Sequence, residues 1–169
     1  SGLTSEQINQ YYKIMLDSLP GADEKTKLNI ANSIWCREGF PVKNSFLDIN
    51  KAYFNAEVRN LDFSKSWAAD TINNWCARNT NDLIKKVVAT PIPEATMAYL
   101  INAIYFKGVW TKQFDKKSTY TGNFTSETGK ANEVNMMSML DTLPYYKDTY
   151  AQYVDIPYGN QTFSMTVIL

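Results

Sequence analysis

Residues 97–115 read M-A-Y-L-I-N-A-I-Y-F-K-G-V-W-T-K-Q-F-D, and this stretch decides the fold. Its first ten residues are apolar except for the amide Asn102. A strand turns successive side chains to opposite faces, so one face carries Ala98, Leu100, Ile104 and Phe106, and the other carries Met97, Tyr99, Ile101 and Tyr105. Because both faces are apolar, we expect a strand that is buried between two layers.

Asn102 lies in the middle of this apolar strand. A buried amide must find hydrogen-bond partners or cost about 1–3 kcal/mol. The apolar run ends at Lys107 and Gly108, and two aromatic residues, Trp110 and Phe114, follow. Without further information, the ordinary interpretation of Trp110 is a side chain packed in the core. The ordinary interpretation of Asn102 is an amide whose hydrogen bonds are made by neighbouring backbone groups.

Length and composition limit the class of protein. The chain has 169 residues, 44% of them hydrophobic, which favours a folded domain with its own core. Seventeen basic residues balance seventeen acidic ones, so nothing favours nucleic acid or an anionic membrane as a partner. No apolar run reaches the roughly 20 residues of a membrane span. No signal peptide is visible, and we interpret the initial Ser1-Gly2 as a cloning remnant.

The chain lacks the residues of the common catalytic and metal centres. It has no histidine, which excludes Ser-His and Cys-His nucleophile pairs and the commonest zinc ligand. No glycine-rich phosphate loop is present. Cys36 and Cys76 lack metal-ligand spacing; two free buried thiols are favoured, and a disulfide or a reactive thiol stays open. We therefore expect no catalytic residue and no metal site; an enzyme built from these residues would have to use carboxylates, lysine, tyrosine or a cofactor.

The remaining sequence mixes helices and strands and then becomes rich in strands. Thr4 and Gln7 form a capping box at the start of a helix that Pro20-Gly21 ends. A second helix is expected over residues 42–54, and a third begins at Ser64 or Ser66. The third carries Trp67, Ala68, Thr71, Ile72 and Trp75 on its apolar stripe, with Asn73, Asn74 and Arg78 pointing away. Further strands are predicted at residues 28–35, 56–63, 120–124, 133–137, 145–146, 151–156 and 163–169, with a hairpin turn at 158–161. This order predicts an α+β fold.

Several of these segments resemble the serpin family. Residues 102–114 match the family pattern N-A-I-Y-F-K-G-x-W-x-x-x-F at every fixed position. The other matching motifs are L-x-x-A-N-x-x-W at 28–35, A-E-V at 56–58 with Asp62-Phe63, I-N-x-W at 72–75 with Thr80, Met136-Met137, and Ile156-Pro157-Tyr158. Asp82 and Leu83 depart from the family, where Gly and Lys are usual, so the turn after the third helix is expected to differ.

The resemblance implies a mixed, mostly antiparallel large sheet covered by helices and followed by a strand-rich segment. It also implies that residues 1–169 form a single but partial serpin domain. The first helices of the family and its C-terminal reactive loop have no counterpart here. The bond that a protease attacks is therefore not expected in this chain, and the target protease cannot be read from it.

The resemblance further implies that the protein inhibits serine or cysteine endopeptidases as a suicide substrate. It therefore implies a protein that is not an enzyme and that uses no cofactor. In serpins, the reactive loop is cleaved and then inserts into the large sheet as a new strand, so the sheet changes conformation. The residues with implied mechanical roles are Leu100, Ile104 and Phe106 lining the slot, Asn102 in the shutter under the sheet, Trp110 in the breach where insertion begins, and Trp67, Ile72, Asn73 and Trp75 on the sheet-covering helix.

Alternatives remain beside this function. The first is a serpin-fold protein without inhibitory activity, such as a carrier or chaperone; the second is an enzyme unrelated to serpins. An open edge on the apolar strand also predicts self-association of the chain. The family favours an extracellular or periplasmic location, an intracellular one stays open, and Asn123 and Asn160 occupy N-glycosylation patterns.

Overall fold

The structure is a computed structural model that describes residues 2–169, and it divides into two compact units. Unit 1 contains the chain up to Ala22 together with Lys27–Lys107, and unit 2 contains Asp23–Thr26 together with Gly108–Leu169. Helices and strands are both present, which confirms the predicted α+β class.

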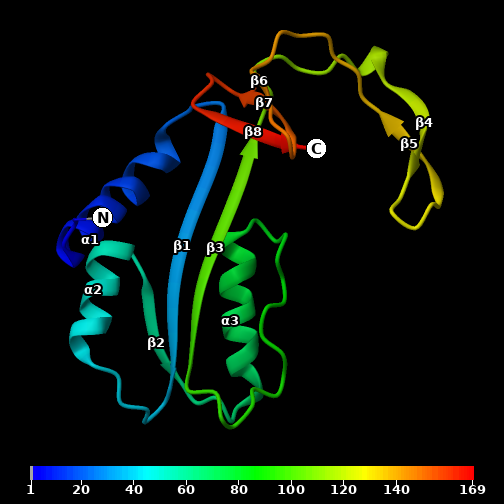
Figure 1. Cartoon of the computed structure of the whole chain (residues 1–169). Helices are drawn as coiled ribbons and strands as arrows, with labels where there is room; N and C mark the ends of the chain where they lie inside the picture. The colour runs from blue at the N-terminus through cyan, green and yellow to red at the C-terminus, as the bar shows by residue number, and fades with distance from the viewer. Residues whose placement is uncertain (1) are drawn as a thin grey trace. The chain divides into compact units, whose positions relative to one another are not determined.

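Unit 1 is built on a mixed three-stranded sheet with the order β2-β1-β3 (Figure 1). Its elements are α1 (Ser5–Ser18), η1 (Leu19–Gly21), β1 (Thr26–Arg37), α2 (Asn44–Phe54), β2 (Glu57–Leu61), α3 (Ser66–Asn79) and β3 (Ala98–Gly108). Strands β1 and β2 are parallel, whereas β1 and β3 run in opposite directions in Figure 1. Arg37 N donates to Met97 O over 2.8 Å, next to the start of β3.

The core of unit 1 lies between α3 and the sheet. Its buried members include Trp35, Leu61, Phe63, Ile72, Trp75 and Ala103. Trp35 and Ile72 are 1% and 0% exposed, and burial of such side chains contributes about 1.5–3 kcal/mol each. This packing is what attaches α3 to the sheet.

Strand β3 corrects one expectation. Ala103 and Tyr105 are buried, but Leu100 and Ile104 on the opposite face are 66% and 57% exposed. The prediction of a strand covered on both faces is therefore wrong for this chain. The physical reason is that α3 covers one face of β3, and no described segment covers the other face over these residues.

Helix α3 corrects three further details. Lys65, not Ser64 or Ser66, is its N-cap, and no side chain caps the helix. Trp67, predicted on the packed stripe, is 51% exposed, because it lies in the first turn, ahead of the buried residues. Asn73, predicted to point away, is 8% exposed, because the segment that returns from α3 towards β3 folds over it.

Unit 2 consists of short antiparallel hairpins. Its elements are η2 (Lys116–Ser118), β4 (Tyr120–Thr125), β5 (Ala131–Met136), β6 (Tyr145–Lys147), β7 (Gln152–Tyr158) and β8 (Phe163–Ile168). Strand β4 pairs with β5, and β6, β7 and β8 form a second sheet in that order. All the strands predicted after Phe114 are present, and the hairpin turn lies where it was expected, between Tyr158 and Phe163.

Both cysteines are free and buried, as the favoured interpretation predicted. Desolvation by burial raises the pKa of the Cys36 thiol and of the Cys76 thiol. A thiol with a raised pKa carries less of the reactive thiolate, so these side chains behave as core residues.

Candidate functional site

The first candidate site is the free edge of β3. In the sheet order β2-β1-β3, this strand pairs with β1 on one side, and no strand among residues 2–169 pairs with its other side. Strand β1 contains residues 28–35, where a strand was predicted. The strand is 11 residues long, and an edge strand of this kind is a template for another strand.

The side chains expected to line the slot lie on one face of β3. Leu100, Ile104 and Phe106 are all exposed, with Phe106 the least exposed at 38%. Tyr99 and Ile101 pack against the core on the α3 side instead. An added strand would therefore bond to the backbone edge and extend the apolar surface formed by these three residues.

Asn102 belongs to an amide network at the centre of the sheet. Its Nδ2 donates to Asn32 Oδ1 over 2.9 Å, and Asn32 Nδ2 donates in turn to Phe54 O over 2.8 Å. The two bonds connect β3, β1 and the last residue of α2. The expectation of a buried amide satisfied by backbone is wrong: Asn102 is exposed, because it lies on the uncovered face of β3, and its contact with Ala31 O is long, at 3.5 Å. Its chief partner is the Asn32 side chain.

Helix α3 is bonded to the sheet as well as packed on it. The rings of Trp35 and Trp75 meet edge to face with centroids 6.2 Å apart. Trp75 Nε1 donates to Glu57 Oε2 over 2.9 Å, which connects α3 to β2. Any movement of α3 off the sheet must break this bond and expose Ile72.

Asn73 holds the segment that returns from α3. Its Oδ1 accepts hydrogen bonds from Val87 N and Val88 N, and its Nδ2 donates to Val88 O. Asn81 and Asp82, in the turn that begins this segment, have φ values of 51° and 61°, in the left-handed region that glycine adopts most easily. Asp82 thus takes a glycine-like backbone conformation at the position where the family has glycine, and a different turn stays a prediction.

Trp110 forms the second candidate site, within unit 2. Its ring stacks on Tyr158 with centroids 4.2 Å apart and an angle of 12° between the planes, and it meets Phe114 edge to face at 6.3 Å. Thr111 N donates to Pro157 O over 2.9 Å, so the backbone beside Trp110 is also fixed to β7. A Cβ on Gly108 would lie 2.9 Å from Tyr158 Cδ1, which explains the glycine at this point of the motif.

Sequence reasoning missed three polar residues that hold these sites. Asn32 carries the same signal as Asn102, an amide among apolar residues, and could have been found by it. Arg37 donates from Nε to Thr96 O over 2.8 Å and from a terminal nitrogen to Pro93 O over 3.1 Å, which fixes the approach to β3. Asp23 bonds to a turn that is distant in the sequence, and no local pattern indicates it.

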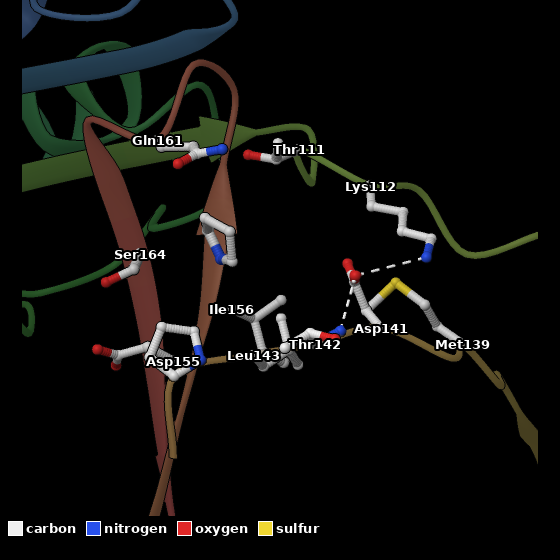
Figure 2. A pocket seen from close by; sticks show the side chains of 12 residues that line it. Thr111, Lys112, Met139, Asp141, Thr142, Leu143, Asp155, Ile156, Gln161 and Ser164 are labelled. Carbon is white, nitrogen blue, oxygen red and sulfur yellow. Dashed lines mark hydrogen bonds and ion pairs between the residues drawn. The ribbon is translucent and has the colours of Figure 1, made fainter. Parts of the chain in front are cut away.

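A hollow of about 410 Å³ lies in unit 2 and contains none of the predicted site residues. Figure 2 shows Asp141 between Lys112 Nζ, at 3.5 Å, and Thr142 N, at 2.8 Å. Within this hollow, the Lys112 ammonium group and the Asp141 carboxylate therefore pair with each other. Among residues 2–169, no group of His, Cys, Asp or Glu side chains could hold a metal ion, and no helix there is long and apolar enough to cross a membrane.

Known proteins similar to this chain are serpins. Neuroserpin of Gallus gallus is 36% identical over 171 residues, covering 94% of this chain and 41% of that protein. Antitrypsin of Bombyx mori is 36% identical over 147 residues, covering 85% and 38%. The native state of the thermophilic serpin tengpin matches with a TM-score of 0.88 and 33% identity, over 99% of this chain and 42% of that one.

A loop C-sheet serpin polymer also matches, with a TM-score of 0.87 and 32% identity, over 99% of this chain and 44% of that one. The chain thus spans about two fifths of the length of these relatives. The family model described as Serpin (serine protease inhibitor) matches residues 2–169. With that match, the motif at residues 102–114 and the architecture of β1, β3 and α3, the chain belongs to the serpin family.

Proposed function

We propose that this chain is part of an inhibitor of serine or cysteine endopeptidases, and that a cleaved loop of the same protein inserts as a strand at the free edge of β3. The observation that carries the proposal is the unpaired edge in the sheet order β2-β1-β3. Membership of a family described by serine protease inhibition supports it. In this function the protein is a substrate that traps the protease, and it is not an enzyme.

The free energy for such a trap comes from the sheet. An inserted strand forms backbone hydrogen bonds with the edge of β3, and each new hydrogen bond contributes about 0.5–1.5 kcal/mol net. It also covers apolar surface next to Leu100, Ile104 and Phe106, at about 25 cal/mol per Å². The form without the inserted strand is then the less stable one, and cleavage releases the difference.

The other site residues take mechanical roles in this proposal. The Asn102–Asn32 pair acts as the shutter, because it joins β3 to β1 and so keeps these two strands together when a strand is added at the free edge of β3. Trp110, stacked on Tyr158, acts as the breach. Helix α3 yields during insertion, and Trp75 with its bond to Glu57 resists that movement.

The test is a search for a covalent complex. The protein that carries this sequence is incubated with trypsin-, chymotrypsin- and papain-type endopeptidases, and with the same proteases blocked at the active site as controls. We expect an SDS-resistant complex with at least one active protease and none with the blocked forms. Uncleaved and cleaved protein are then compared by thermal melting, and we expect Tm to rise after cleavage. Cleavage by every protease without a complex, and with an unchanged Tm, would support the non-inhibitory alternative.

Self-association through the same edge is a second consequence of this proposal. The solved loop C-sheet serpin polymer shows that a protein similar to this chain can self-associate. In this chain the 11-residue strand β3 lies at an edge of its sheet, which offers a place for such association. We expect the 169-residue chain to sediment as oligomers whose size increases with concentration. A compact monomer at all concentrations, with one cooperative melting transition, would contradict this expectation.

A further inference from the structure

The turn between β7 and β8 holds the segment that follows β3. Gly159 N donates to Val109 O over 2.8 Å, and Thr111 Oγ1 donates to Gly159 O over 3.0 Å. Tyr158, at the start of the same turn, stacks on Trp110. The position of Trp110 in unit 2 therefore depends on the position of this turn.

Asp23 holds the turn from its other side. The residue is 3% exposed, and its Oδ2 accepts a hydrogen bond from Asn160 N over 2.7 Å. Its Oδ1 accepts one from Lys25 N over 2.8 Å. Gly159 has a φ of 50°, and a Cβ there would collide with the Asp23 carboxylate, so the contact requires glycine. The two carboxylate oxygens thus join two separate backbone segments of unit 2.

We propose that Asp23 is a positioning residue of the breach: its carboxylate holds the β7–β8 turn, the turn holds Trp110, and release of the turn speeds insertion of a strand beside β3. The last step rests on the proposed function. A carboxylate suits this position because it accepts hydrogen bonds on both oxygens, and charge-assisted bonds to backbone N–H groups are stronger than neutral ones.

A purely local role for Asp23 makes a different prediction. The bond from Lys25 N to Asp23 Oδ1 spans two residues and is an Asx turn, which asparagine forms as readily as aspartate. Asp23→Asn therefore keeps the local turn. It removes one acceptor and directs an amide NH₂ at a backbone N–H, so the bond to Asn160 N is lost while the shape of the side chain is conserved.

Asp148→Asn is the matched control. Asp148 accepts hydrogen bonds from Tyr150 N over 2.7 Å and from Ala151 N over 2.8 Å, so it also caps a turn of unit 2 through backbone N–H groups. Its hydrogen-bond partners Tyr150, Ala151 and Tyr153 lie in and beside the turn between β6 and β7, and the substitution is chemically identical. A general loss of stability in unit 2 would affect both variants alike.

The experiment compares both variants with the unaltered protein that carries this sequence. Exchange of the Asn160 amide and acrylamide quenching of Trp110 are measured, the latter as the difference from the same protein with Trp110→Phe. We expect Asp23→Asn to open the Asn160 amide about 10- to 150-fold more often, as loss of a charge-assisted hydrogen bond implies, and to increase Trp110 quenching. Asp148→Asn should leave both readings unchanged. Thr111→Val removes the hydrogen bond from Thr111 Oγ1 to Gly159 O, so it releases the turn from its other side and should also increase Trp110 quenching. This variant tests the hold of the turn on Trp110 if Asp23→Asn does not fold.

The rate of spontaneous conversion to an inactive, strand-inserted form is the second readout. We expect it to increase in Asp23→Asn relative to Asp148→Asn. Unchanged Asn160 exchange and Trp110 quenching in Asp23→Asn would overturn the positioning role, as would altered Trp110 quenching with an unchanged insertion rate. If Trp110 is released but no protease forms a covalent complex with the unaltered protein, the proposed function fails, while the hold of Asp23 on the turn stands.

Discussion

Replacement of Asn73 by alanine should detach the segment that returns from α3 towards β3. The side chain makes three hydrogen bonds to this segment, at 2.8 Å to Val87 N, 2.9 Å to Val88 N and 2.9 Å to Val88 O. Val88 is 3% exposed, so water cannot readily replace the lost partners while the segment stays in place. Asn73→Ala therefore leaves buried backbone groups unpaired.

The expected cost follows from these bonds. At about 0.5–1.5 kcal/mol net for each hydrogen bond, their loss destabilises the segment by about 2–4 kcal/mol. Alanine also gains up to about 0.7 kcal/mol of helix propensity over asparagine. Asn74→Ala is the matched control, because Asn74 is the next residue of α3 and is exposed. The gain in propensity is the same in both variants and cancels in the comparison.

Native-state hydrogen exchange measures this difference directly. The Val87 and Val88 amides should exchange about 30- to 1,000-fold faster in Asn73→Ala than in Asn74→Ala, which corresponds to 2–4 kcal/mol at about 1.4 kcal/mol per factor of ten. A difference below about threefold would refute the reasoning, since it would mean that the bonds to Asn73 do not hold the segment.

Three other changes test neighbouring parts of the structure. Gly108→Ala would place a Cβ 2.9 Å from Tyr158 Cδ1 and 3.1 Å from Thr26 Cγ2. In urea unfolding, we expect its free energy of unfolding to be about 1–3 kcal/mol lower than that of the control Gly21→Ala, whose Cβ meets nothing within 4 Å. Equal free energies of unfolding would contradict the close packing at Gly108. In the same assay, Asn32→Ala should lower the free energy of unfolding by about 0.5–1.5 kcal/mol more than Asn102→Ala, because Asn32 bonds to both Asn102 and Phe54. Equal losses would show that the bond to Phe54 contributes nothing. Hydrogen bonds from the Tyr150 and Ala151 amides lower the pKa of Asp148. Its contribution to stability is therefore complete above the unfolded carboxyl pKa of about 3.9 and is lost as pH falls through the lower folded pKa. NMR titration of this carboxyl should give a pKa below that of an unfolded peptide, and a normal or raised pKa would contradict the turn geometry.

Many elements of unit 1 and the strands of unit 2 follow from local patterns. Alternation along residues 97–106 correctly separated Tyr99 and Ile101 from Leu100 and Ile104, because a strand reverses the side-chain direction at every residue. Thr4 and Gln7 form the expected capping box, because both partners lie within one turn of helix. Such features depend on residues that are close in the chain, so the sequence determines them by itself.

Burial and long-range bonding depended on the tertiary structure. Periodicity could not show that one face of β3 is left uncovered, because it reports the direction of side chains and not which segments pack against them. Asn73 was assigned to the solvent for the same reason: residues 87 and 88 reach it only after the chain turns back. The sequence alone therefore determined the family, the main elements and the free-edge strand. Only the tertiary structure brought Asn32 to Asn102 and Asp23 to Asn160, since each contact joins segments whose approach depends on the packing of the folded chain.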